Sequence, residues 1–165
     1  MGAAASALGM LALVAAGVVI ARRQITIVSV TGQSMEPALT AGDRVLVRRA
    51  RLRSVRTGQI VVVETPSADR EWTGKPAGRD LARVWMIKRV AAIPGEPLPD
   101  GLPAAIADAT AVPAGKLIVL GDNPPMSMDS RYLGYVPGER LLGVVVGSLP
   151  RHRSSAEAPM VVRTT

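Results

Sequence analysis

The sequence predicts a mainly β protein, in which a small antiparallel β domain follows one N-terminal transmembrane helix. Three observations lead to this fold class. Residues 2–21 carry no charge. After them, short runs rich in β-branched residues alternate with stretches rich in Pro and Gly, and no stretch has the periodicity of an amphipathic helix. We therefore expect an anchor over residues 1–23, a β domain over residues 24–149 and a flexible tail over residues 150–165.

The uncharged N-terminal segment reads GAAASALGMLALVAAGVVIA. At about 1.5 Å per residue, such a helix spans a bilayer core of about 30 Å. A cleaved signal peptide is the alternative, but its usual basic residues are missing before Ala7, which favours a retained anchor. Arg22 and Arg23 follow directly, and the positive-inside rule taken alone would place the rest of the chain in the cytoplasm.

The predicted strands of the β domain lie at residues 25–30, 45–47, 59–64, 84–92, 116–120 and 141–148. Val, Ile and Thr are frequent in these runs, as is typical of side chains that pack on a pleated sheet. The long connections at 65–80 and 94–115 are rich in Pro and Gly. Strands joined by such turns, without crossover helices, favour an antiparallel sheet.

The composition excludes several kinds of catalytic site. The chain has no Cys and a single His, His152, which lies in the predicted tail. Thiol nucleophiles, zinc sites and a Ser-His-Asp triad are therefore not expected, and we expect no metal and no cofactor. A hydrolytic reaction would need a carboxylate, a Lys or the N-terminus as its base.

The net charge of +7 makes nucleic acid or an anionic membrane surface the first partners to consider. Arginines crowd the stretch from Arg44 to Arg56, which has no acidic residue after Asp43. They form either a solvated basic face or a contact to phosphate or lipid. Because no aromatic residue lies beside them to stack on bases, we expect no nucleic acid partner.

The first segment with a chemical signal, residues 32–39, reads GQSMEPAL. Ser34 lies just past the first predicted strand, in a turn restricted by Pro37. Its hydroxyl is thereby held in a defined, exposed position, as a nucleophile requires. Taken alone, the segment is also explained by a surface serine in a loop, which is the simpler interpretation.

The second segment, residues 84–95, reads VWMIKRVAAIPG. Strand alternation places Lys88 on the same face as Met86 and Val90. A lysine on a buried face loses solvation, which lowers its pKa toward the range of a general base. The alternative is an edge strand whose lysine extends out to water.

The third segment, residues 120–131, reads LGDNPPMSMDSR. Its Gly, Asp, Asn and Pro residues favour a tight turn. Asp129 and Arg131 lie two positions apart, so we expect them to pair on one face of an extended segment. A hydrogen-bonded loop without a chemical role is the alternative.

In this order and spacing, the three segments resemble the type I signal peptidases, which are membrane-anchored Ser/Lys endopeptidases that remove signal peptides from exported proteins. The resemblance covers about residues 22–143 and points to a minimal bacterial-type member. It implies that Ser34 is the nucleophile, that Lys88 is the general base, and that Met35 packs beneath the site. The residues that it implies for orienting and supporting the lysine are Asp122, Asn123, Ser127, Asp129, Ser130 and Arg131.

The resemblance also implies particular contacts. Ser127 would hydrogen-bond Lys88, and Asp129 would form a structural salt bridge with Arg131. Gly32 stands where some relatives carry a Ser that helps to hold the oxyanion. Ala38 replaces a common Thr, and PPM fills the usual polar insert at residues 124–126.

The implied partners are the lipid bilayer and preprotein signal peptides with small residues before the cut. The implied location is the cell membrane, with a single span and the catalytic domain on the outer side, which opposes the charge of Arg22 and Arg23. A dedicated maturation protease of the same superfamily, for one secreted or metalloenzyme precursor, remains an alternative. So does a catalytically silent membrane protein that binds preproteins or nucleic acid.

Overall fold

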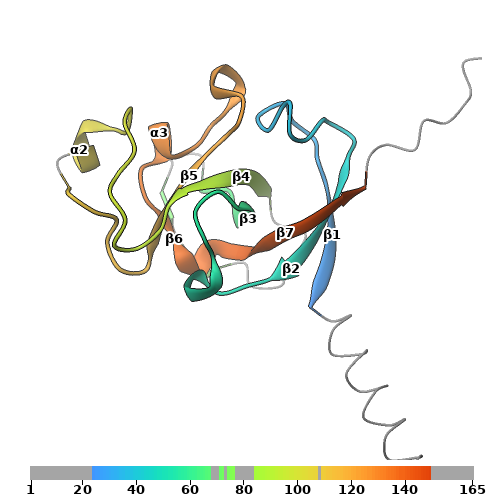
Figure 1. Ribbon diagram of the computed structural model, residues 1–165, viewed down its shortest axis with the longest axis horizontal. Helices are drawn as coiled ribbons and strands as arrows, with labels where there is room; N and C mark the ends of the chain where they lie inside the picture. The colour runs from blue at the N-terminus through green and yellow to red at the C-terminus, as the bar shows by residue number, and fades with distance from the viewer. Residues whose placement is uncertain (1–23, 68–70, 73, 77–83, 108, 150–165) are drawn as a thin grey trace, which may run out of the picture.

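A computed structural model describes residues 24–67, 71–72, 74–76, 84–107 and 109–149 (Figure 1). Its main feature is a seven-stranded antiparallel sheet with the strand order β1-β2-β7-β3-β4-β5-β6. The strands are β1 (Ile25–Ser29), β2 (Arg44–Arg49), β3 (Ile60–Glu64), β4 (Trp85–Ala92), β5 (Lys116–Leu120), β6 (Val136–Pro137) and β7 (Leu141–Leu149). The predicted antiparallel β domain is therefore confirmed.

The helices of the described residues are single turns: α2 (Ala104–Ala107), α3 (Ser130–Leu133), and the 3-10 turns η1 (Leu52–Ser54), η2 (Pro124–Met126) and η3 (Gly138–Arg140). One of them corrects the sequence analysis. Residues 129–131 do not form an extended segment, because Asp129 is the N-cap of α3 and accepts a hydrogen bond from the backbone N–H of Arg131 at 3.1 Å. A carboxylate at this position satisfies an N–H group of the first helical turn, so it favours the turn over extension.

Within these described ranges, no helix is long and apolar enough to cross a membrane. The predicted anchor (residues 1–23) and the predicted tail (residues 150–165) lie outside the described residues.

The sheet has a core on each face. Val62 of β3 packs in one buried cluster with Met35 and Ile87, whereas its neighbours Val61 and Val63 belong to a second cluster. Successive side chains of a strand point to opposite faces, so β3 is buried on both sides. Each such aliphatic side chain contributes roughly 1.5–3 kcal/mol of transfer free energy. β3 and its neighbour β4 thus hold the side chains that they carry in fixed positions.

Two loops extend from the same side of this sheet. The first follows β1 and is closed at its base by two hydrogen bonds, from Val30 N–H to Asp43 O (2.8 Å) and from Gly42 N–H to Val30 O (2.7 Å). The second follows β5 and leads into α3. Figure 1 shows them next to each other, the first in blue and the second in orange. They bring together two segments about 90 residues apart in the sequence, as the hydrogen bond between Asn123 and Gln33 records.

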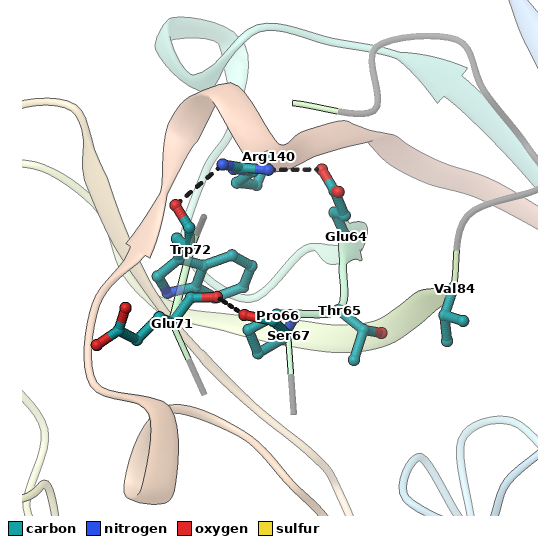
Figure 2. Close-up of a pocket in the computed structure, with 8 residues that line it drawn as sticks. All are labelled: Glu64, Thr65, Pro66, Ser67, Glu71, Trp72, Val84 and Arg140. Carbon is teal, nitrogen blue, oxygen red and sulfur yellow. Dashed lines mark hydrogen bonds and ion pairs between the residues drawn. The ribbon is translucent and has the colours of Figure 1, made fainter. Parts of the chain in front are cut away.

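A buried ion pair lies in another part of the fold (Figure 2). Arg140 Nη1 lies 3.2 Å from Glu64 Oε2, and both side chains are at most 5 % exposed. Arg140 Nη2 also donates to the carbonyls of Trp72 (3.1 Å) and Gly74 (2.7 Å). Glu64, Trp72 and Arg140 border a cavity of about 220 Å³ that Ser67 and Val84 also line. The guanidinium thus attaches the segment around Trp72 to β3.

Candidate active site

The loop that follows β1 is held in place by the residues next to Ser34. Met35 and Leu39 are 1 % and 4 % exposed and pack in the first core cluster. The N–H of Leu39 donates to Met35 O at 2.9 Å, which closes a turn. Ser34 itself stays partly exposed, so its hydroxyl is accessible on a fixed backbone.

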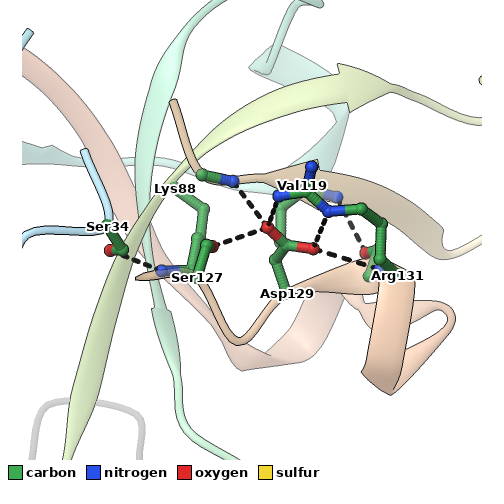
Figure 3. Close-up of polar contacts among 8 residues, drawn as sticks. Ser34, Lys88, Val119, Ser127, Asp129 and Arg131 are labelled. Atoms are coloured by element: carbon green, nitrogen blue, oxygen red, sulfur yellow. Dashed lines mark hydrogen bonds and ion pairs between the residues drawn. The ribbon is translucent and has the colours of Figure 1, made fainter. Parts of the chain in front are cut away.

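Lys88 reaches this hydroxyl from the sheet. Its Nζ donates a hydrogen bond to Ser34 Oγ at 2.7 Å, as Figure 3 shows, and the residue is 3 % exposed. The alternative of an edge strand is wrong, because β4 lies between β3 and β5 and Lys88 is paired with Val61. A neutral Lys88 amine at the same distance can instead accept a hydrogen bond from the Ser34 hydroxyl. The contact is therefore possible in both protonation states of the lysine.

The surroundings of Lys88 favour its neutral form. Burial lowers the pKa of Lys88; the Asp129 carboxylate acts against this shift, and the Arg131 guanidinium adds to it. A lysine ammonium that has lost water and gains little from a nearby anion gives up its proton more readily. This arrangement can remove a proton from a serine hydroxyl.

Asp129 is the centre of a buried network. Its carboxylate is fully buried and accepts hydrogen bonds from Gly121 N–H (2.8 Å), Ser127 Oγ–H (2.6 Å) and Arg131 Nε–H (3.0 Å). Arg131 Nη2 lies 2.5 Å from Asp129 Oδ2, so the predicted ion pair between Asp129 and Arg131 is present. Burial raises the pKa of Asp129, but the hydrogen bonds from Arg131, Gly121 and Ser127 outweigh it and hold that pKa below its usual value.

Two serines of the third segment contact other groups than the lysine. Ser127 donates its proton to Asp129, whereas the resemblance implied a hydrogen bond with Lys88. A carboxylate is the stronger acceptor, and this donation leaves the lone pairs of the hydroxyl oxygen available. Ser130 Oγ accepts from the N–H of Val119 at 3.0 Å, so Ser130 joins α3 to β5.

Asp122 and Asn123 also contact residues other than Lys88. Asp122 forms a two-point ion pair with Arg89, at 2.8 Å and 2.6 Å. Arg89 follows Lys88 on β4 and therefore points to the other face. Asn123 joins the two loops, since its N–H donates to Ser34 O (3.0 Å) and its Nδ2 donates to Gln33 O (3.1 Å).

The sequence analysis missed the roles of Gly121 and Arg89. A Cβ on Gly121 would lie 2.6 Å from Ser34 O and would overlap Ser127, so only glycine fits between the two loops. Its place at the start of the GDN sequence is the one signal that could have indicated a close approach. Gly32 differs, because a Cβ there would meet nothing within 4 Å.

A cleft of about 150 Å³ leads to Ser34 and Lys88. It lies between the end of β1 and the start of β4, and its walls include Val28, Val30, Gly32, Met35, Trp85 and Ile87. The described part of the chain contains no cluster of three or more His, Asp or Glu side chains that could hold a metal ion. The cleft is narrow and its lining is mixed, because Ser29 and Thr31 border it together with Ser34, Lys88 and the apolar side chains.

Comparisons with known proteins agree on one family. The family described as "Signal peptidase, peptidase S26" matches residues 3–98 and 101–149. Probable signal peptidase I-2 of Synechocystis sp. is 31 % identical over 134 residues, which cover 69 % of this chain and 58 % of the relative. Signal peptidase I of Leptolyngbya laminosa is 28 % identical over 131 residues, which cover 71 % and 64 %. The chain thus spans about six-tenths of the length of these relatives.

Among solved structures, signal peptidase I from Enterococcus faecalis V583 is similar, with a TM-score of 0.38 and 22 % identity over 56 % of this chain and 97 % of that one. The family match covers most of the chain, including both segments that meet at the cleft. The chain therefore belongs to the signal peptidase family, peptidase S26.

Proposed function

We propose that this protein is a membrane-anchored serine endopeptidase that removes signal peptides from exported preproteins through a Ser34/Lys88 dyad. The observation that carries the proposal is the 2.7 Å contact between Lys88 Nζ and Ser34 Oγ, made by a lysine that is 3 % exposed. Membership of the signal peptidase family supports it.

In the proposed reaction, neutral Lys88 takes the proton of Ser34 as Oγ forms a bond to the scissile carbonyl carbon. The backbone N–H of Ser34 helps to hold the oxyanion. When the C–N bond breaks, Lys88 passes the proton to the leaving amine, and an acyl-enzyme remains. Water then attacks the ester, again with Lys88 as base. Asp129, held by Arg131 and Ser127, fixes the electrostatic surroundings of the lysine.

The cleft supports substrates with small residues, typically Ala, at the first and third positions before the cut. Its volume of about 150 Å³ and the aliphatic and aromatic side chains among its walls leave little room for a large side chain. A small pocket excludes a larger side chain by overlap.

We further propose that residues 1–23 anchor the chain in the cell membrane by one span, that residues 24–149 form the catalytic domain on the outer side, and that residues 150–165 are a flexible tail. The uncharged run of residues 2–21 supports the anchor. The outer position follows from the substrates, which are cut after export.

The test is cleavage of a panel of preproteins by the full chain in detergent, with the cut site read by mass spectrometry. We expect cleavage after a small residue in several preproteins, and none with Ser34→Ala. Cleavage of a single precursor would point to a dedicated maturation protease. Absence of cleavage in the whole panel would contradict the proposed function.

A further inference from the structure

A second surface adjoins the dyad outside the cleft. The segment 121–128 is joined to the loop that follows β1 by the hydrogen bonds from Asn123 to Ser34 O and Gln33 O. None of the residues 121–128 lines the cleft between β1 and β4. The segment therefore adjoins Ser34 and Lys88 outside the cleft.

The segment exposes two large apolar side chains. Met126 is 57 % exposed and Met128 is 49 % exposed, whereas Ser127 between them is 5 % exposed. The backbone of Ser127 is extended, with φ −120° and ψ 119°, and its side chain points inward to Asp129. The exposed fractions of the methionines on either side of it show that both point outward.

The position of these methionines is fixed even though their side chains are free to adapt. Pro124 and Pro125 form the 3-10 turn η2 before them, and the buried Ser127 and Asp129 hold the backbone after it. One exposed apolar side chain is ordinary on a protein surface. Two unbranched, polarizable thioethers exposed on either side of one buried residue, on a fixed backbone, make a surface that fits partners of varied shape.

We propose that Met126 and Met128 form a contact surface for the first residues of the mature polypeptide, those that follow the scissile bond. The inference rests on the proposed function. In acylation, the Ser34 Oγ–C bond forms and the C–N bond breaks, and the proton of Ser34 passes through Lys88 to the leaving nitrogen. The acyl half occupies the cleft, so the leaving half extends out of the cleft past the dyad, toward the segment 121–128.

The apolar thioethers of Met126 and Met128 determine which residues are preferred after the scissile bond. Apolar side chains at the second and third positions after the cut bury thioether surface and are favoured, whereas acidic side chains lose hydration against the thioethers. Because methionine adapts its shape, the preference is graded and many sequences are accepted. These properties suit an enzyme with many substrates.

The test compares reporter precursors that are identical up to the cut and carry Leu, Ala or Asp at the second and third positions after it. The full chain, in detergent, is compared with the double variant Met126→Ser/Met128→Ser. We expect wild type to cleave the Leu reporter with a kcat/KM about three- to tenfold above that of the Asp reporter, since an open surface discriminates less than an enclosed pocket. The double variant should lose most of this ratio and keep its rate on the Ala reporter.

A second measurement tests this surface separately from the binding of the residues that precede the scissile bond. Ala-Leu-Leu-amide and Ala-Asp-Asp-amide, which place Leu or Asp at the second and third positions after the new bond, are offered as amines that compete with water for the acyl-enzyme. We expect wild type to transfer the acyl group to Ala-Leu-Leu-amide preferentially, and the double variant to show no preference. The control is Val146→Ser, which removes a 50 % exposed apolar side chain from β7 and should retain both wild-type preferences.

The outcomes separate the two proposals. If wild type cleaves the Ala reporter but the double variant keeps the wild-type Leu-to-Asp ratio, the contact surface is wrong and the proposed function stands. If the double variant slows all reporters equally, and only on anionic phospholipid vesicles, the methionines contact lipid and the inference is overturned. If wild type cleaves none of the reporters, the proposed function fails and the inference fails with it.

Discussion

Replacing Asp129 by Ala tests the buried network most severely. The carboxylate is fully buried and accepts from Gly121, Ser127 and Arg131. The substitution leaves these donors without their acceptor, and it leaves the Arg131 side chain, 24 % exposed, without its anion. It also removes the N-cap of α3.

The magnitude follows from burial. Breaking a buried pair by removing one partner costs about 3–5 kcal/mol. Because Arg131 is partly exposed, the lower part of this range applies to the pair, and the lost cap adds about 1 kcal/mol. We expect a loss of about 4 kcal/mol in the free energy of unfolding, which lowers the Tm by roughly 10–20 °C in a domain of this size.

The assay is thermal and urea unfolding of the full chain in detergent, with Asp122→Ala as matched control. Asp122 also pairs with an arginine, but Arg89 is 38 % exposed. A pair at that exposure is screened by solvent, and its loss should cost about 1 kcal/mol or less. Equal losses in the two variants would refute the argument from burial.

The pH dependence gives an independent check. The pKa of Asp129 is held below its usual value in the folded protein. Its contribution to stability is therefore present above the unfolded pKa of about 3.9 and is lost as the pH falls through the folded pKa. The stability difference between wild type and Asp129→Ala should shrink on acidification below about pH 4. A difference that stays constant would count against the charged pair.

Three further results are expected. Burial lowers the pKa of Lys88, and Arg131 lowers it further. The kcat/KM of a reporter should therefore rise with pH to a plateau that is reached below pH 10.5, the ordinary pKa of a lysine. Arg131→Gln should move that rise to higher pH, and an unmoved pH profile would contradict the assigned electrostatics. Gly32→Ser places its side chain in open space and should leave the Tm unchanged while raising kcat through a second oxyanion donor; a lowered Tm or an unchanged kcat would show that the hydroxyl is misplaced. Replacing Ala by Phe at the first position before the cut should suppress cleavage, measured as kcat/KM, whereas Gly or Ser should be tolerated; equal processing of the Phe reporter would show that the cleft is not the acyl pocket.

The strands were predictable because their signal is local. Every predicted run contains or overlaps an observed strand, and the bounds differ by three residues or fewer. β6 was missed because it has only two residues, Val136 and Pro137, too few for any period to show. α3 was missed for the same reason, since it is a single turn whose start depends on one capping carboxylate.

The partners within the site were less predictable because they depend on contacts far apart in the sequence. Asp122 pairs with Arg89 across 33 positions, and Asn123 meets Gln33 across 90. Composition and spacing carry no information about such pairs. Asp129 and Arg131 were correctly paired, although by a helical cap and not by an extended backbone. The burial of Lys88 was predictable, because the alternation of β4 already placed it among apolar residues.

The central claim is that Ser34 is a nucleophile made reactive by Lys88. A serine-reactive acylating probe, mapped on the intact full chain by mass spectrometry, tests it most directly. We predict one adduct on Ser34 in wild type and none in Ser34→Ala. We also predict none in Lys88→Arg, whose guanidinium does not deprotonate in proteins. Undiminished labelling of Lys88→Arg, or labelling of wild type at another residue, would contradict the dyad.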